Sequence, residues 1–284
     1  MKLRKVTAAT AAALVLALTA TACGGDDGDG GSDSTGGESG GKKIKVGIKY
    51  DQPGIGLKSP DGKFSGFDVA VATYVAKELG YAEGDIEFIE TPSAERENAL
   101  SRGDVQFIAA SYSINDEREK SVDFAGPYLL AHQDLLVKAD SDIKSGTDLN
   151  GKKLCSVTGS TSAQNVKEKI APKAQLQELG TYSECIEGLA SGQVDALTTD
   201  DSILAGYAAQ EQYKGQFKLA GLELSNENYG IGVKEGSDLK AKINTALEKM
   251  VSDGAWEQAV KDNFGDTYEN EPAPKVGTVV PPKA

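Results

Sequence analysis

The side chains with the most chemistry to offer are hydroxyls and a few charged groups that follow short apolar segments. They are Lys49, Ser93, Ser111, Ser113, Ser160, Thr161 and Asp200. Hydroxyls, an ammonium and a carboxylate can bind a small polar molecule through hydrogen bonds and charge. Each of these residue types is also common at helix caps and in turns, which is the alternative at every single position. Their recurrence at one kind of location favours a shared binding site.

Catalysis and metal binding find little support in the same side chains. The only histidine, His132, has no cysteine beside it, so a structural role or at most pH sensitivity is expected. Asp200 and Asp201 are adjacent, so their carboxylates point apart and cannot flank one bond of a substrate. Cys155, Cys185 and one histidine do not make a zinc site. The sequence predicts a binding protein without metal or cofactor, and an enzyme is the less favoured alternative.

Alternating strand and helix signals place the polar residues in space. Apolar strands are expected over 44–49, 86–90, 105–109, 153–157, 175–179 and 194–198. Helical patterns cover 67–79, 93–102, 162–170, 182–190 and 202–210. This alternation predicts an α/β fold with parallel sheets that carry helices on both faces. Ligands of such sheets bind beyond the carboxyl ends of the strands, where the polar residues lie.

The N-terminal residues predict an exported chain. A short basic region precedes a run of small and apolar residues from Val6 to Ala22, which suits a signal peptide. Cys23 follows this run and resembles the lipidated cysteine of a bacterial lipoprotein signal, although Ala20 stands where a leucine is usual. Residues 24–41 contain almost only Gly, Asp, Ser, Thr and Glu, which suits a disordered tether. An ordinary signal peptide that happens to contain a cysteine is the alternative.

Charge and cysteine content narrow the class of protein further. The formal net charge of −13 makes nucleic acid an improbable partner, because the phosphates would be repelled. Once Cys23 is assigned to lipid, Cys155 and Cys185 are left, and pairing is the default for thiols of an exported chain. Their bridge would close a loop of about 30 residues and stabilise the fold by about 3 kcal/mol. Residues 269–284 are rich in proline and predict an extended, unpacked tail.

Five motifs, in order along the chain, resemble the signatures of bacterial extracellular solute-binding proteins of family 3. They are GFDV at 66–69, SYSINDER at 111–118, VDFA at 122–125, GSTS at 159–162 and VDALTTDD at 194–201. The similarity runs from about Lys42 to Asp266. Residues 47–54 and the cysteine pair look, more narrowly, like glutamate-binding lipoproteins of actinobacterial-type glutamate ABC importers.

This resemblance implies a two-lobed periplasmic-binding-protein fold of type II, the Venus flytrap. The implied segments are a signal peptide at 1–22, a lipidated cysteine and disordered tether at 23–41, lobe one at 42–128 plus 229–268, lobe two at 133–224, and a disordered Pro-rich tail at 269–284. The implied function is capture of an amino acid, first of all L-glutamate, for ABC permease subunits. Glutamine, aspartate or another polar amino acid is the alternative ligand. We expect a monomer at the extracytoplasmic face of the cell membrane, held there by its lipid.

The resemblance also assigns roles to individual residues. Arg118 takes the position of the arginine that binds the ligand α-carboxylate, and Ser113 and Thr161 complete that subsite. Asp200 falls where the ligand ammonium is held. This assignment makes chemical sense, because a planar guanidinium grips a carboxylate with two parallel hydrogen bonds and a carboxylate opposite it attracts the ammonium.

The subsite for the ligand side chain rests on a Ser-x-x-Arg pattern. In glutamate and aspartate binders this pattern contacts the distal carboxylate, and Ser93 and Arg96 match it here. Lys49 stands near a basic position with the same role. The alternative for Arg96 is a solvated helix residue that pairs with Glu95 or Glu97. Many family members carry an aromatic platform where this chain has Pro53-Gly54.

A first prediction concerns the anchor. Replacing Cys23 with Ala should release the protein into the medium or leave its precursor uncleaved, because position 23 then has no thiol to carry lipid. Fractionation of cells that express each form measures the effect, with Ala20→Leu as a control that keeps the cysteine. Normal membrane retention of Cys23→Ala would contradict lipidation.

Overall fold

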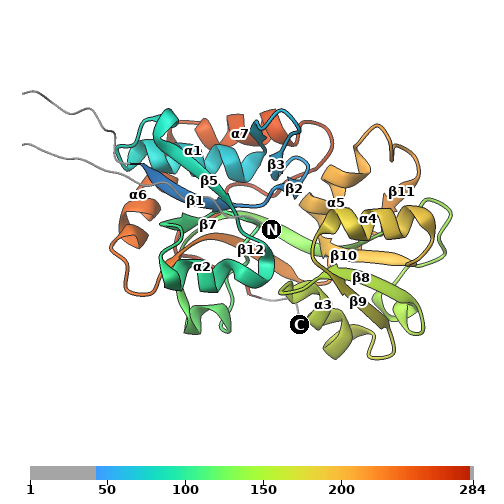
Figure 1. Cartoon of the computed structure of the whole chain (residues 1–284). Coiled ribbons are helices and arrows are strands. Elements are labelled where there is room, and N and C mark those ends of the chain that lie inside the picture. The colour runs from blue at the N-terminus through green and yellow to red at the C-terminus, as the bar shows by residue number, and fades with distance from the viewer. Residues whose placement is uncertain (1–42, 282–284) are drawn as a thin grey trace, which may run out of the picture. The chain divides into compact units, whose positions relative to one another are not determined.

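A mixed sheet of nine strands runs through residues 43–281, the part of the chain that this computed structural model describes (Figure 1). The strand order is β5-β1-β6-β12-β7-β10-β8-β9, and β11 pairs with β7. These strands are β1 (Ile44–Ile48), β5 (Ile86–Glu90), β6 (Phe107–Ile108), β7 (Val122–Lys138), β8 (Lys153–Val157), β9 (Gln175–Leu179), β10 (Ala196–Asp200), β11 (Phe217–Leu219) and β12 (Asn226–Lys234). A three-stranded sheet is formed by β2 (Asp51–Gln52), β3 (Gly56–Lys58) and β4 (Phe64–Ser65).

The long strands β7 and β12 join two lobes. Within the first lobe Val122–Ala125 pairs with Ile231–Lys234, and within the second lobe residues 133–137 of β7 pair with β10. Between the lobes residues 129–132 of β7 pair with 226–229 of β12, a segment that we call the hinge. We use "first lobe" for β1–β6 with their helices and "second lobe" for β8–β11 with theirs.

Strand direction differs in part from the sequence prediction. The pairs β1–β5, β1–β6, β8–β9 and β8–β10 are parallel, as predicted. Strands β7 and β12 are antiparallel to each other, and β10 is antiparallel to β7. The physical reason is that one strand carries the chain into the second lobe and the other brings it back, so they must run in opposite directions.

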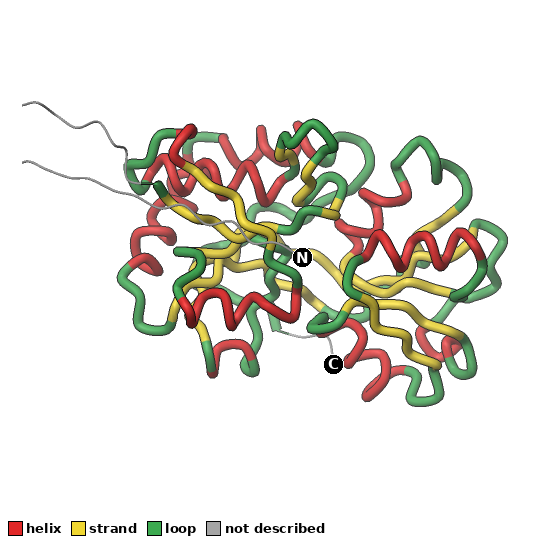
Figure 2. The backbone as a smooth tube through the Cα atoms, viewed as in Figure 1, coloured by secondary structure: helices red, strands yellow, loops and turns green. Residues whose placement is uncertain are grey.

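Helices cover the sheet on both sides (Figure 2). They are α1 (Phe67–Glu78), α2 (Arg96–Arg102), α3 (Thr161–Asn165), α4 (Tyr182–Ser191), α5 (Asp201–Ala208), α6 (Leu239–Ser252) and α7 (Ala255–Asn263). In α1 the fully buried Val71 and Val75 lie one turn apart, which is the spacing that puts apolar side chains on one face. Helix α5 begins one residue earlier than expected, so its N-cap is Asp200.

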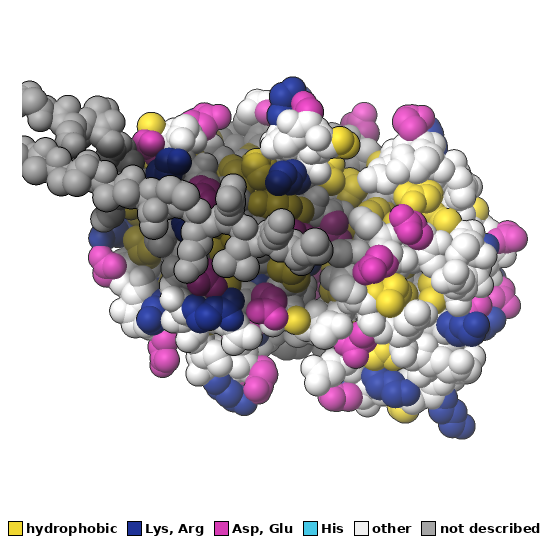
Figure 3. All heavy atoms as spheres, viewed as in Figure 1, with side chains coloured by type: hydrophobic (Ala, Val, Ile, Leu, Met, Phe, Trp, Pro, Cys, Tyr) yellow, Lys and Arg dark blue, Asp and Glu magenta, His cyan; other side chains and the backbone are white. Residues whose placement is uncertain are grey.

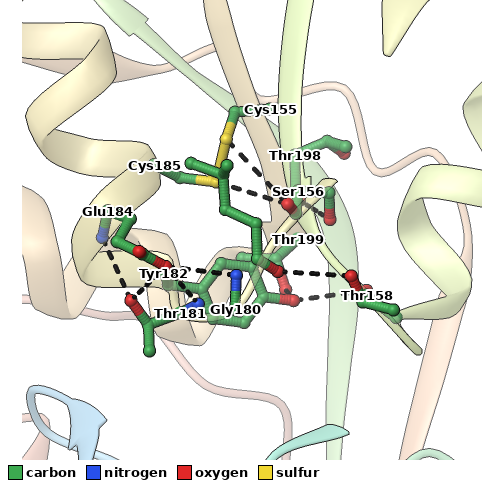
Figure 4. Close-up of a disulfide and its surroundings, with 12 residues drawn as sticks. Cys155, Ser156, Thr158, Gly180, Thr181, Tyr182, Glu184, Cys185, Thr198 and Thr199 are labelled. Atoms are coloured by element: carbon green, nitrogen blue, oxygen red, sulfur yellow. Dashed lines mark hydrogen bonds between the residues drawn. A yellow bond between two sulfur atoms is a disulfide. The ribbon is translucent and has the colours of Figure 1, made fainter. Parts of the chain in front are cut away.

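A disulfide links the two cysteines of the second lobe, as the sequence predicted (Figure 4). Cys155 lies in β8 and Cys185 in α4, with an S–S distance of 2.07 Å and a Cα–Cα distance of 5.6 Å. Both residues are fully buried. The bridge therefore fixes helix α4 against the sheet of its own lobe.

The C-terminal segment 269–281 packs against the hinge, which corrects the expectation of an unpacked tail. Val280 N donates to Asn228 Oδ1 and Asn228 Nδ2 donates back to Val280 O, each at 2.9 Å. Asn226 Nδ2 donates to Pro281 O at 2.7 Å. An extended, proline-rich segment still offers backbone groups for hydrogen bonding, and the asparagine side chains of β12 use them.

Some sequence predictions fall outside the described residues, namely the signal peptide at 1–22, the lipidated Cys23 with its tether at 23–41, and residues 282–284 of the tail. Over residues 43–281 no helix combines the length and the apolar character needed to cross a membrane. On the face shown in Figure 3, acidic and basic side chains are interspersed among uncharged ones.

The disulfide gives the second prediction. A Cys155→Ser/Cys185→Ser protein should lose about 3 kcal/mol of unfolding free energy, because the unfolded chain regains the freedom of a loop with sequence separation 30. Urea denaturation of the oxidised native protein and of the variant measures the difference. Reduction of the native protein should reproduce the loss, and two free thiols in the exported native protein would contradict the bridge.

Candidate functional site

A cavity lies between the lobes, at the carboxyl ends of β5, β6, β8 and β10. Its lining comes from both lobes and consists of Ser93, Arg96, Ser111, Ser113, Arg118, Ser160, Thr161, Ser162, Tyr182, Thr199, Asp200 and Ile203. The structure thus brings together the residues that the sequence singled out. Lys49 stands at the edge of this group, with its Nζ 3.4 Å from Ser93 Oγ.

Arg118 is fixed from both lobes. Its Nη1 donates to Ser113 O at 2.7 Å, and its Nη2 donates to Gly159 O of the second lobe at 3.2 Å. The Tyr112 ring centroid lies 5.1 Å from the guanidinium carbon, and Nε is 3.7 Å from Glu97 Oε1. The side chain is largely buried. A guanidinium held in this way is oriented before a ligand arrives.

Arg96 is a buried cation and not a solvated helix residue. It is 2% exposed, and its Nη1 donates to Ala110 O at 2.9 Å and to Ser111 O at 3.3 Å. Its guanidinium lies 4.1 Å from the Tyr112 ring centroid. Burial and the neighbouring Arg118 lower the pKa of Arg96 to about 10. Within the described residues its buried Nε finds no hydrogen-bond partner, so one donor is free for a ligand.

Lys49 adds a third basic group beside Ser93. It is buried and lies after the end of β1, with its Nζ 5.8 Å from the Tyr182 ring centroid. Burial, together with the positive charge of Arg96, lowers the pKa of Lys49 to about 8, although the negative charge of Asp51 opposes the shift. A ligand carboxylate beside Lys49 would favour its charged form.

Asp200 is the acidic group of the cavity lining. It ends β10 and precedes the first residue of α5, which directs its carboxylate into the space between the lobes. Its Oδ2 accepts a hydrogen bond of 2.6 Å from the Tyr229 hydroxyl. Burial raises the pKa of Asp200 well above its usual value, and Glu227 raises it further. A ligand ammonium would favour the charged carboxylate.

The hydroxyls of the cavity are held by neighbouring groups. Ser160 Oγ accepts from Ser162 N at 3.3 Å and from the Tyr182 hydroxyl at 3.2 Å. Ser111 has a positive φ of 42°, a conformation that is uncommon for a residue with a side chain. Its backbone N donates to Asp68 Oδ2 at 2.7 Å, so the GFDV motif fixes the loop that carries Ser111.

Sequence reasoning missed part of the lining. Tyr182 was predicted only as a helix start, yet its hydroxyl accepts from Thr199 Oγ1 at 2.7 Å beside the disulfide (Figure 4). Thr199 and Ser162 lie inside motifs that had been recognised, and that position was the available signal. Tyr112 does not line the cavity, but its ring centroid lies 4.1 Å from the guanidinium of Arg96 and 5.1 Å from that of Arg118.

The lobes touch each other around the cavity. Tyr182 N donates to Asp51 Oδ2 at 2.9 Å, and the Tyr207 hydroxyl donates to Asp51 O. At Gly159, whose φ is 81°, a Cβ atom would come within 2.6 Å of Ala94 N in the first lobe. These contacts describe lobes closed over the cavity.

No group of three or more His, Cys, Asp or Glu side chains within residues 43–281 is arranged to hold a metal ion.

Two lobes closed over a small polar cavity are the typical architecture of a solute-binding protein. The chain belongs to the bacterial extracellular solute-binding proteins, family 3, whose pattern matches residues 44–266. It is 46% identical to the glutamate-binding protein GluB of Corynebacterium efficiens over 92% of this chain and 91% of that protein. The glutamine-binding protein GlnH of Bacillus subtilis is 43% identical over 77% and 80% of the two chains.

Solved structures agree with this assignment. An ancestral arginine-binding protein bound to arginine matches with a TM-score of 0.73 and 37% identity, covering 79% of this chain and 99% of that one. A cysteine-binding protein from Campylobacter jejuni matches with a TM-score of 0.75 and 25% identity, over 80% and 91% of the chains. The two-lobed α/β fold of type II that the sequence implied is thereby confirmed.

The third prediction concerns Lys49 and the stability of the ligand-free protein. Below about pH 8 the lysine is charged in both folded and unfolded chains, so the folded state bears the full cost of burying that charge. Between pH about 8 and 10.5 the unfolded chain binds more protons, so stability rises with pH. Lys49→Met should therefore raise the unfolding free energy at pH 7 by about 3 kcal/mol at most, and this gain should disappear as the pH approaches 10.5.

Urea denaturation at several pH values measures this effect. Lys45→Met changes an exposed lysine of β1, the strand that Lys49 follows, and should have little effect on stability. Equal stability of Lys49→Met and the native protein at pH 7 would contradict a costly buried charge.

Proposed function

We propose that this protein captures L-glutamate outside the cytoplasm and delivers it to the permease subunits of an ABC transporter. The observation that carries the proposal is the charge pattern of the cavity. Arg118, Arg96 and Lys49 supply positive charge, and Asp200 supplies a carboxylate. Glutamate has the complementary pattern of two carboxylates and one ammonium.

The α-amino-acid group has a defined place in this proposal. Its carboxylate binds the guanidinium of Arg118 together with Ser113 and Thr161, and its ammonium binds Asp200. Pairing of charges is what makes such a buried arrangement favourable, because an uncompensated charge in a closed cavity is costly. Ser111 and Ser160 complete the hydrogen bonding around the same group.

The ligand side chain points toward Arg96, Lys49 and Ser93. Among residues 43–281 the buried Nε of Arg96 has no hydrogen-bond partner, which supports a ligand group that accepts hydrogen bonds, because buried donors are rarely left unpaired. A carboxylate can accept from a guanidinium and an ammonium at once, whereas the NH₂ of a carboxamide would face donors. This end of the cavity therefore selects glutamate over glutamine.

The cellular setting is proposed from the chain's family and its N-terminal sequence. Cys23 carries the lipid, and the tether at 23–41 separates the lobes from the membrane surface. The protein stays, as a monomer, at the extracytoplasmic face of the membrane. Closure of the lobes presents the loaded form to the permease. We propose binding without turnover, since similar proteins are named as glutamate-binding and glutamine-binding proteins.

Glutamine is the second candidate ligand. It is supported by the 43% identity to GlnH and by a 42% identity to a glutamine-binding protein of Geobacillus stearothermophilus over 67% of this chain and 72% of that protein. Aspartate keeps the charge of glutamate but is one methylene shorter.

The fourth prediction tests the ligand. In calorimetric titrations of the ligand-free protein, glutamine should bind at least about a hundredfold more weakly than glutamate, a difference of about 2.7 kcal/mol. Aspartate should fall between them. Arg96→Gln should reduce the difference in affinity between glutamate and glutamine, because it removes the buried cation whose charge a carboxamide cannot compensate.

The matched control is Arg102→Gln, which changes an exposed arginine of the same helix α2 and should leave this difference unchanged. Equal or tighter binding of glutamine to the native protein would overturn the glutamate assignment. Conversion of the bound amino acid to a product would overturn the assignment as a binding protein.

A further inference from the structure

Tyr229 contacts both lobes. Its backbone pairs with a loop of the first lobe, and its side chain forms a hydrogen bond with the second lobe. It belongs to the hinge segment of β12 and is fully buried. A shift in the pairing of β12 with β7 occurs between Tyr229 and Ile231. This irregularity coincides with the point where the strand also pairs with a loop that lines the cavity.

On the side of the first lobe, Tyr229 is paired with Ser113 through an isolated antiparallel bridge. The flanking bonds are Ile114 N to Asn228 O at 2.8 Å and Gly230 N to Tyr112 O at 2.9 Å. The carbonyl of Ser113 in turn accepts the 2.7 Å hydrogen bond from Arg118 Nη1. The backbone around Tyr229 therefore holds the loop that orients Arg118.

On the side of the second lobe, the Tyr229 hydroxyl donates to Asp200 Oδ2 at 2.6 Å. Ser202 Oγ lies 3.3 Å from the same hydroxyl. A phenol has a single proton, and the shorter contact to a carboxylate takes it, so Ser202 donates to the phenol oxygen. The result is a relay from Ser202 through Tyr229 to Asp200, in which each bond polarises the next.

We infer that Tyr229 is a positioning residue that couples the two halves of the amino-acid site, the loop beneath Arg118 and the carboxylate of Asp200. Its hydroxyl fixes the direction of that carboxylate and favours its charged form. The inference rests on the proposed function only in that the ligand carries an α-ammonium and an α-carboxylate.

The charge of Asp200 depends on all groups that face it. They are Glu227 of β12, Asp201 of α5, Arg118, Tyr182 of α4, and Tyr268 after α7. Among them Glu227 and Asp201 oppose a negative charge on Asp200, while the Tyr229 hydrogen bond and Arg118 favour it. Removing the hydroxyl leaves the repulsion in place and takes away one of the compensating interactions.

The fifth prediction uses Tyr229→Phe in the full chain, which removes the hydroxyl and keeps the ring that packs on Tyr128. Calorimetry across pH 4 to 8 should show glutamate binding weakened about ten- to a hundredfold at neutral pH. The acid limb of the binding curve, the range in which affinity falls as the pH is lowered, should move to higher pH. The reason is that loss of the Tyr229 hydrogen bond raises the pKa of Asp200. Glutamine binding should weaken by the same factor as glutamate binding, since both ligands present the same α-amino group.

Ser202→Ala removes only the outer donor of the relay and should shift binding and the acid limb in the same direction by a smaller amount. Tyr74→Phe is the control for loss of a tyrosine–carboxylate hydrogen bond elsewhere, because Tyr74 bonds Asp253 on the first lobe, and it should bind normally. If Tyr229→Phe fails to fold, Ser202→Ala still decides the question.

Unchanged affinity in Tyr229→Phe would overturn the inference. Weaker binding with an unmoved acid limb would also overturn it, because that result describes a merely structural residue. If the native protein prefers glutamine, the glutamate assignment is refuted but this test still applies. The same loss of affinity and the same pH shift in Tyr229→Phe are expected with either ligand.

Discussion

The structure depends on keeping positive charge in a place with little water. Arg96 and Arg118 lie close enough to affect each other, and burial with this repulsion lowers the pKa of Arg96 to about 10. Lys49 beside them has its pKa lowered to about 8. Such a cluster is tolerated when carbonyl oxygens and an aromatic face compensate for part of the lost hydration, as Ser113, Ala110 and Tyr112 do here. A dicarboxylate ligand would complete the compensation.

The scaffold explains how the charges can be both buried and reachable. The cations belong to the first lobe and Asp200 to the second, so the site exists as a unit only while the lobes are closed. The hinge of β7 and β12 is the shared element, and the segment 269–281 lies against it through Asn226 and Asn228. Opening would expose the cations to water, and closing with a ligand would pair them. Ligand charge and lobe closure are thus coupled by the cost of desolvation.

Local features could be predicted from the sequence, and features that depend on closure could not. Apolar periodicity predicted α1 with Val71 and Val75, and the family resemblance pointed to Arg118 and Asp200, which line the cavity. The antiparallel course of β12 depends on pairing with a strand about a hundred residues earlier, which no local pattern reveals. Tyr182 and Tyr229 were missed as site residues, because their roles arise when segments far apart in the chain meet. The proline-rich segment was misjudged, since composition shows poor self-packing but not that two asparagines will bind it.

The most direct test of the central claim is a crystal structure of the protein with L-glutamate bound. The account predicts that the α-carboxylate forms two hydrogen bonds of about 2.8 Å with the Arg118 guanidinium while the ammonium contacts Asp200. The distal carboxylate should accept from Arg96 Nε, the donor that lacks a partner among the described residues. A glutamate whose side-chain carboxylate points away from Arg96 and Lys49, or whose α-carboxylate does not touch Arg118, would contradict the account.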